Sequence, residues 1–404
     1  MRIDPATHGW LEEPETRAVM QALGHARFVG GAVRNALLGA PVADIDIAVP
    51  IPPEETVKRL EAADIKAIPT GFDHGTVTAI KNGKVFEVTS LRRDVATDGR
   101  HAVVAYTTQW DEDAARRDFT INALYAAPDG EIFDYNGGLQ DLVSGKVRFV
   151  GDPNARIQED YLRILRLFRF HAWYGKGEMD ADALRAAAQG KAGLAQLSGE
   201  RIAKEILRLL ECPNPAPVLR TMAASGILPE LLPFALQLPR LERLIHTDAD
   251  NFFPADALLR LAALLPDDPA AARGVAERLR LSSADRTRLE ALSAAEKMPV
   301  HPSAQAVRKL LYRLGAVAFK DKVRLNWAAA PPSANAIPWR MLLSVADTYE
   351  KPRFALTGHD IMQAGVPEGP QVGKILTQIE DWWIDNDFPD TGITEQLKAL
   401  TAPQ

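Results

Sequence analysis

The spacing of apolar residues changes once along this chain, near residue 155, and the change limits the folds the chain can adopt. Before it, runs with a period of two, typical of strands, alternate with segments of helical spacing. After it, the apolar patterns all have helical spacing, in segments 156–173, 198–210, 217–224, 255–265, 271–279, 304–314 and 372–383. The sequence therefore predicts an α+β fold, with a mixed sheet in the first 150 residues and an all-helical remainder.

Local signals place the strands and helices of the first part. A short apolar run ends at Gly30-Gly31, and an alternating run ends at Pro50. Asn82-Gly83 is typical of a type I′ hairpin turn. The predicted strands are 28–29, 44–49, 76–80 and 85–88, and the predicted helices are about 12–24, 32–38 and 54–62.

Composition narrows the class of protein. The chain has 404 residues, of which 47% are hydrophobic and 25% charged, as in an ordinary globular protein. It has no run of 18 apolar residues that could form a membrane-spanning helix. Its first ten residues lack the apolar region of a signal peptide. The only cysteine is Cys212, which excludes an intramolecular disulfide and a multi-cysteine zinc site, so a cytoplasmic protein with no membrane partner is expected. The net charge is −6, so if the protein binds nucleic acid, it must do so through local patches of positive charge.

Two aspartates on one predicted strand are candidate metal ligands. Asp44 and Asp46 lie two residues apart, so their side chains leave the same face, while the opposite face is apolar. Two carboxylates this close repel unless a cation lies between them, and oxygen ligands favour Mg²⁺. Glu87, on a second strand, is a possible third ligand, although it is equally an exposed strand residue.

A glycine pair precedes these aspartates. Gly30 and Gly31 lie between a strand and a helix, where glycine lets backbone approach a ligand and free N–H groups attract phosphate. Arg34 follows one turn later and can reach the same anion. By itself the pair is also compatible with a plain tight turn.

A third candidate site lies on the segment 156–173, predicted as one helix. Asp160, Arg163 and Arg166 are three residues apart and would share a face that Arg169 extends. This is either an amphipathic helix with surface salt bridges or a surface that reads a base. Cytosine and adenine offer an amine beside an unprotonated ring nitrogen, which an aspartate and an arginine can recognise. Uracil and guanine leave both contacts unmet, at about 1–3 kcal/mol each.

Four motifs follow one another along the chain. They are Gly30-Gly31-Ala32-Val33-Arg34 with Leu37-Leu38-Gly39 and Asp44-Ile45-Asp46, then Arg116 to Ala123, Glu159-Asp160-x-x-Arg163, and Ser198-Gly199-Glu200-Arg201-Ile202. In this order they resemble the motifs of bacterial-type (class II) CCA-adding tRNA nucleotidyltransferases and their poly(A) polymerase relatives. A C-terminal segment, 358–373, is also similar to the tail of these enzymes. Asn35 departs from the pattern, because the family often has aspartate there.

The resemblance implies an architecture and an activity. It implies a polymerase-beta-like head (1–150), then a nucleotide-selecting neck (151–215), a body (216–338) and a tail (339–404), all three helical. The reaction would add C, C and A to the 3′ end of tRNA from CTP and ATP, by two-metal nucleotidyl transfer that releases pyrophosphate. No protein general base is needed, and no protein partner is implied.

The resemblance also implies roles for residues. Asp44 and Asp46 would be the catalytic carboxylates that bind Mg²⁺. The nucleotide would be bound by Gly31, Arg34, Arg117, Asp160, Arg163, Arg166 and Arg169.

Two further segments are relevant to RNA binding. Between Arg308 and Arg324 there are six lysines or arginines and one aspartate, either a phosphate-contacting surface or a solvated helix face. The segment 92–100 is a candidate for the flexible head loop that would accompany the change from C to A addition.

Other functions remain open at this stage. A poly(A) polymerase, or an enzyme that adds only CC or only A, would share this chemistry. A catalytically silent tRNA-binding protein is a more remote alternative, because both metal aspartates are present.

Overall fold

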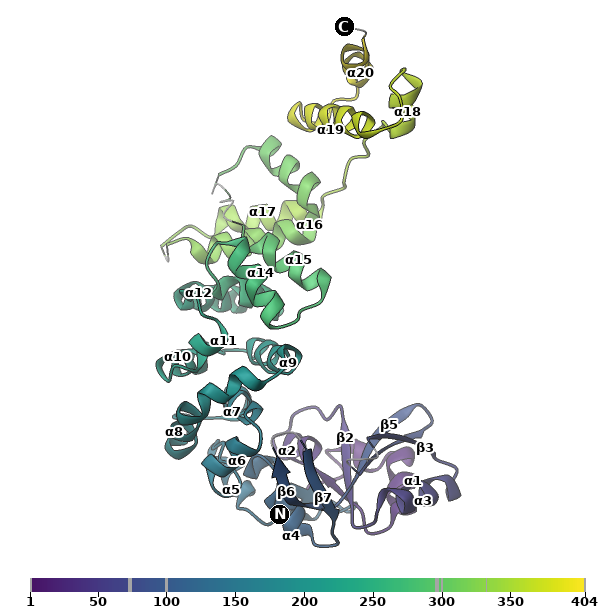
Figure 1. Cartoon of the computed structure of the whole chain (residues 1–404), viewed down its shortest axis with the longest axis vertical. Coiled ribbons are helices and arrows are strands. Elements are labelled where there is room, and N and C mark those ends of the chain that lie inside the picture. The colour runs from purple at the N-terminus through teal and green to yellow at the C-terminus, as the bar shows by residue number, and fades with distance from the viewer. Residues whose placement is uncertain are drawn as a thin grey trace. The chain divides into compact units, whose positions relative to one another are not determined.

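The computed structural model describes residues 2–71, 75–98, 101–294, 298, 301–331 and 333–402. The chain forms two compact units, Met1–Pro233 and Phe234–Gln404. The first contains the strands and the second is helical among its described residues, which confirms the α+β prediction with its mixed-sheet head (Figure 1). The finer division at residues 150, 215 and 338 stays a prediction.

The head is built on a seven-stranded mixed sheet in the order β3-β4-β5-β2-β1-β8-β9, with β6 and β7 as a separate pair. Among the strands that the structure describes, β2 and β5 are parallel neighbours, and the other pairs in this sheet are antiparallel. The strands are β1 (Arg27–Val29), β2 (Ile45–Val49), β3 (Lys66–Gly71), β4 (Thr76–Lys81), β5 (Lys84–Ser90), β6 (Arg92–Asp98), β7 (His101–Tyr106), β8 (Leu124–Ala126) and β9 (Ile132–Asp134).

The turn chemistry predicted the β4–β5 hairpin correctly. Asn82 and Gly83 have φ of 51° and 82°, as a type I′ turn requires.

The segment 92–100, predicted as a flexible head loop, differs from that prediction in the structure, because its first seven residues form strand β6 and pair with β7. Residues 99 and 100 lie outside the described residues.

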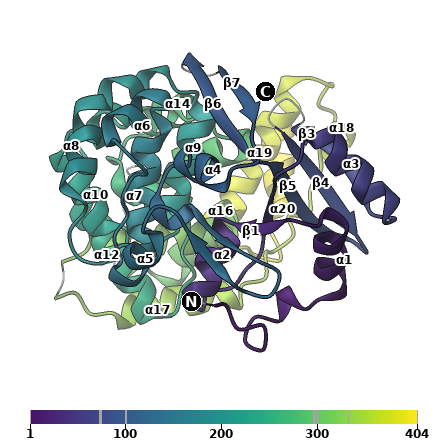
Figure 2. The ribbon, with the colours of Figure 1, turned by 90° about the horizontal axis from the view of Figure 1, so that it is seen from below.

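Helices flank the sheet and then continue alone through the rest of the first unit (Figure 2). They include the predicted N-terminal helix. The helices are α1 (Pro14–Leu23), α2 (Gly31–Leu37), α3 (Pro53–Ala62), α4 (Trp110–Ala115), α5 (Gly138–Ser144), α6 (Pro153–Glu159), α7 (Leu162–Tyr174), α8 (Ala181–Gly190), α9 (Gly199–Leu210), α10 (Ala216–Ala224) and α11 (Ile227–Leu231), with 3₁₀ turns η1 (Gly9–Leu11), η3 (Thr120–Asn122) and η4 (Lys191–Gln196).

The single helix predicted over 156–173 is wrong, because the chain breaks between α6 and α7. Asp160 is extended, with φ −156° and ψ 107°. Its carboxylate accepts a hydrogen bond from Leu162 N at 3.1 Å, so it satisfies a donor at the start of α7. Asp160 therefore does not continue the helical face of Arg163 and Arg166.

The second unit is a stack of helices. Its longest helix, α16, continues past the predicted end at Leu314 through a kink at Gly315, which has φ of 76°. Phe319 and Val323 of this helix pack with Trp339 in a buried cluster. The helices are α12 (Leu238–Asp250), α13 (Ala257–Leu264), α14 (Pro269–Arg278), α15 (Ser283–Leu292), α16 (Ala304–Ala329), α17 (Ile337–Asp347), α18 (Gly358–Gln363), α19 (Pro370–Asp385) and α20 (Ile393–Thr401).

Among the helices that the structure describes, none combines the length and apolar character needed to cross a bilayer.

Candidate active site

One cavity in the first unit, of about 740 Å³, brings together most of the predicted site residues. Its walls come from α2, β2, β5, α7, α9 and the segment around η3. The lining residues are Gly30, Gly31, Arg34, Asn35, Ala43, Asp44, Asp46, Glu87, Arg117, Asp118, Asn122, Arg166, Arg169, Phe170, Trp173, Tyr174, Lys204, Glu205 and Arg208.

The glycine pair shapes one edge of this cavity. Gly30 has φ of 67°, a conformation that residues with a Cβ rarely adopt. A Cβ on Gly30 would lie 3.9 Å from Asp46 Oδ2 and 4.0 Å from Arg117 Nη1. These are ordinary van der Waals contacts, so the positive φ rather than a lack of space favours glycine at this position. The turn at Gly30 lies at the edge of the cavity, near a carboxylate and a guanidinium.

Three carboxylates line the cavity together. Asp44 comes immediately before β2, and Asp46 lies within β2 beside Glu87 of β5 in parallel register. Burial, together with the negative charges of Glu87 and Asp44, raises the pKa of Asp46 to about 6. This environment favours a bound cation.

The oxygen-only donor set fits Mg²⁺, which prefers carboxylates and water. Within the described part of the chain, no group of three or more His, Cys, Asp or Glu side chains is already arranged around a metal position. A role for Glu87 as a third ligand therefore stays a prediction.

Arg34 lines the same cavity and is held in place by several side-chain contacts. It is 7% exposed, and burial lowers the pKa of its guanidinium. It donates to Asn122 Oδ1 at 2.5 Å and to Tyr174 OH at 2.9 Å, and it lies over the Tyr174 ring at 4.1 Å. A buried arginine fixed by neutral partners keeps its charge available to an anion.

Asn35, the departure from the family pattern, takes part in this arrangement. Its Oδ1 accepts from Arg34 at 2.9 Å, and its Nδ2 donates to Pro41 O at 3.1 Å. Aspartate could make only the first contact, because a carboxylate has no N–H to donate. Asn35 therefore ties Arg34 to the loop before Asp44.

Arg117 is oriented by a residue that the sequence analysis missed. Asp113, on α4, accepts from Arg117 Nη2 at 2.8 Å and from Tyr125 OH at 2.7 Å. Burial alone would raise the pKa of Asp113, but the guanidiniums of Arg117 and Arg116 lower it to about 2. The sequence signal was the spacing of Asp113 four residues before Arg117, although Arg117 lies two residues beyond the end of α4.

Arg166 and Arg169 reach the cavity from α7 with acidic partners. Arg166 donates to Asp118 at 2.5 Å, and Arg169 donates to Glu205 of α9 at 2.5 Å. The Asp118 side chain also accepts from Asn122 Nδ2 at 3.0 Å. The second motif and the α7 arginines thus form one connected network.

Asp160 and Arg163 are not among the described residues that line the cavity. Asp160 forms an ion pair with Arg201 at 2.7 Å, and Arg163 pairs with Glu159 at 2.5 Å. Their predicted common helical face is lost with the break at Asp160. Both would have to exchange partners to contact a base.

In the basic segment 308–324 most of the cations pair with aspartates, and its role as a phosphate-contacting surface stays a prediction. Lys322 and Arg324 are buried, at 6% and 9% exposure. Arg313 pairs with Asp381 at 2.9 Å, and Arg324 with Asp248 at 2.7 Å. The other pairs are Arg308 with Asp387, Lys309 with Asp385 and Lys320 with Asp347.

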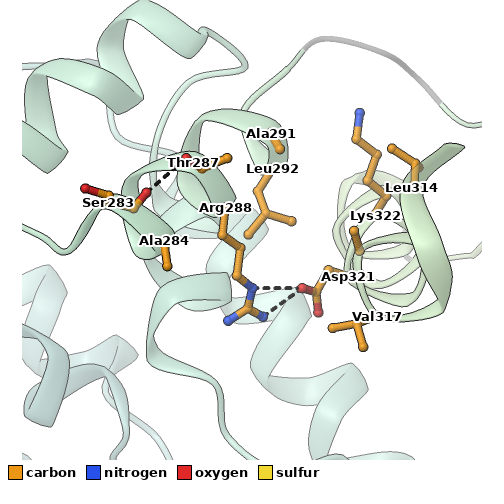
Figure 3. Close-up of a pocket in the computed structure, with 11 residues that line it drawn as sticks. Ser283, Ala284, Thr287, Arg288, Ala291, Leu292, Leu314, Val317, Asp321 and Lys322 are labelled. Atoms are coloured by element: carbon orange, nitrogen blue, oxygen red, sulfur yellow. Dashed lines mark hydrogen bonds and ion pairs between the residues drawn. The ribbon is translucent and has the colours of Figure 1, made fainter. Parts of the chain in front are cut away.

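The second unit has a cavity of its own, of about 610 Å³, between α15 and α16 (Figure 3). Its lining is mainly aliphatic and includes Leu292, Leu314 and Val317. The carboxylate of Asp321 is paired with Arg288 at 2.7 Å. This cavity therefore lacks the unpaired carboxylates of the first.

Two family models match parts of the chain. Residues 26–148 match the family model described as "Poly A polymerase head domain". Residues 178–238 match "Probable RNA and SrmB- binding site of polymerase A".

Curated relatives extend the similarity over most of the chain. It is 33% identical to the mouse "CCA tRNA nucleotidyltransferase 1, mitochondrial", over 88% of this chain and 82% of that protein. It is 31% identical to the "CCA-adding enzyme" of Streptococcus sanguinis, over 96% of this chain and 97% of that protein. The solved CCA-adding enzyme of Bacillus stearothermophilus in complex with CTP superposes with a TM-score of 0.73 at 28% identity, covering 93% of this chain and 94% of that one.

Proposed function

Because this chain belongs to the family of CCA tRNA nucleotidyltransferases, the CCA-adding enzymes, we propose that it adds C, C and A to the 3′ end of tRNA. The substrates are CTP, ATP and tRNA, and pyrophosphate is released. A cytoplasmic location is part of the same proposal.

The observation that carries the proposal is one cavity in which carboxylates face arginines. Nucleotidyl transfer needs a cation to hold a triphosphate and positive groups to balance the charge that develops on it. Asp44 and Asp46 would bind the cation, and Arg34 and Arg117 would be the positive groups. A catalytically silent RNA-binding protein has no need of this pairing.

Asp44 and Asp46 are the proposed Mg²⁺ ligands, with Glu87 as a possible third. When bound, the metal supplies charge neutralisation at the triphosphate and lowers the pKa of the RNA 3′-hydroxyl. The elevated pKa of Asp46 supports this role, since its anionic form is poorly stabilised by the protein alone.

Arg34 and Arg117 are proposed to bind the triphosphate together with Gly31, which lines the same cavity. Both enter the cavity with orientations set by Asn122, Asp113 and Tyr125. Pre-oriented donors stabilise charge in the transition state without reorganising during the reaction. Arg166 and Arg169 extend this positive surface toward the base.

Asp160 and Arg163 remain the proposed readers of the base. For this, Arg163 has to leave Glu159 and Asp160 has to leave Arg201 when the nucleotide binds. The substitution Arg163→Ala should reduce the ratio of C and A incorporation to U and G incorporation by about 10-fold or more. The measurement is incorporation of each of the four nucleotides under single-turnover conditions, and an unchanged preference would remove this assignment.

Extension of three tRNA transcripts tests the proposal as a whole. The transcripts end before CCA, after C and after CC, and each is incubated with Mg²⁺ and single or mixed nucleotides. We expect completion to CCA and a stop there. Long A tracts would instead indicate a poly(A) polymerase, and a stop at CC or a need for preformed CC would indicate a split-function enzyme. No incorporation by the folded protein would favour the silent RNA-binding alternative.

A further inference from the structure

The rim of the catalytic cavity on α7 and α9 carries three residues that the proposed chemistry does not use. Trp173 lies in the last turn of α7, and Lys204 and Arg208 lie one turn apart on α9. All three line the same cavity as Asp44 and Asp46. An aromatic ring beside two cations is a typical surface for single-stranded nucleic acid.

The indole of Trp173 is exposed but fixed in place. The residue is 40% exposed, although large aromatic side chains are usually buried. Its Nε1 donates to the backbone oxygen of Arg208 at 2.9 Å, which anchors α7 to α9. Nearby, Cys212 Sγ donates to Ala172 O at 2.9 Å and reinforces the same junction. A ring held this way offers a face to a ligand at little entropic cost.

The two cations beside it can be redirected to phosphate. Lys204 is exposed. Arg208 pairs with Glu211 at 3.3 Å, where the side chains are 64% and 41% exposed. Exposed pairs of this kind contribute little, so a phosphate can replace the carboxylate. Arg169, in contrast, pairs with Glu205, whose side chain is only 6% exposed.

We infer that Trp173 stacks on the 3′-terminal base of the tRNA, while Lys204 and Arg208 bind the phosphates that precede it. This inference rests on the proposed function. The terminal base of the primer changes with each addition, so its binding site has to accept different bases. Stacking on an aromatic face tolerates every base, whereas hydrogen bonds to base edges do not.

The kinetic test compares Trp173→Ala and Trp173→Phe with Phe252→Ala, an aromatic residue of the second unit that is 94% exposed. We expect Trp173→Ala to raise the KM for tRNA by about 10-fold or more and to leave the KM for CTP and ATP within about 2-fold. Trp173→Phe should retain most of the affinity, because it keeps a ring. Phe252→Ala should change neither constant. A rise in the KM for nucleotides alone would instead place the incoming base on Trp173 and overturn the inference.

A binding test does not depend on turnover. A tRNA with 2-aminopurine at its 3′ end should lose fluorescence on binding the wild-type protein and not on binding Trp173→Ala. Equal quenching by both proteins would refute the stack. If the wild-type protein quenches the probe but extends no tRNA, the proposed function fails while the stack stands.

Salt dependence tests the two cations separately. Lys204→Gln and Arg208→Gln should each reduce the slope of log affinity for tRNA against log salt by about 0.7, the value for one phosphate contact on a single strand. An unchanged slope in both variants would show that these residues do not contact phosphate.

Discussion

Asp113 offers a quantitative test of how the cavity is held together. It is only 1% exposed and accepts hydrogen bonds from Arg116, Arg117 and Tyr125. Its pKa falls from 3.8 to about 2, despite burial, because of the two guanidiniums. A shift of this size corresponds to about 2 kcal/mol of stabilisation.

The direction of the pH dependence follows from the lowered pKa. The folded state favours the ionised carboxyl, so the stabilisation is complete above the unfolded pKa of 3.8. It is lost as the pH falls toward 2, and roughly half remains at pH 3. Asp113→Asn removes one partner of a buried pair and should cost about 3 kcal/mol at pH 7.

Urea unfolding of the full chain at pH 7 and pH 3 measures this effect. Hydrogen exchange of peptides covering residues 110–126 reports the first unit separately from the second. The difference in unfolding free energy between wild type and Asp113→Asn should shrink by about 1 kcal/mol between the two pH values. The exposed Asp111 lies on the same helix, and Asp111→Asn should change stability by less than about 0.5 kcal/mol. A difference that is constant with pH would refute the reasoning.

Two further substitutions test the cavity wall and the packing beside it. Asn122→Ala removes one of the three side-chain acceptors of Arg34, so we expect the KM for CTP and ATP to rise about 10-fold with little change in the KM for tRNA; equal effects on both substrates would contradict a role in holding Arg34. Gly138→Ala places a Cβ against the backbone oxygen of Thr120 and should destabilise the first unit by about 3 kcal/mol in thermal unfolding. Gly373→Ala has open space around it and should be neutral or stabilising; a comparable loss in both variants would show that the contact is not the cause.

The parts of the site that follow from local sequence were predictable. Asn82-Gly83 specifies its own turn, and the alternation around Asp46 specifies which face of β2 is buried. Gly30 and Asp46 then lie near each other because β1 and β2 are neighbours. Such features depend on residues that are close in sequence or on adjacent strands.

The parts that depend on distant partners were not predictable from spacing. Helical periodicity continues through Asp160, but the break there is stabilised by a bond to Leu162 N and by Arg201 from α9. Tyr174 contacts Arg34 only because α7 packs beside the head.

Charge counting along the sequence could not foresee the partners of the basic segment 308–324, for the same reason. Five of its six cations pair with aspartates far away in the chain. A local excess of one sign does not reveal whether the fold supplies the opposite charge from another helix. Net charge in a window is therefore weak evidence for a nucleic-acid surface.

The most direct test of the central claim is extension of a tRNA that lacks CCA by Asp44→Asn and Asp46→Asn, with Mg²⁺, CTP and ATP, at single-nucleotide resolution. Asp64→Asn, at an exposed carboxylate of the same unit, is the matched control. We predict that the first two variants fold normally by circular dichroism but lose roughly 10³-fold or more of the extension rate, while the control is unaffected. Extension by either variant at a rate near that of wild type would contradict the assignment of this cavity as the catalytic site.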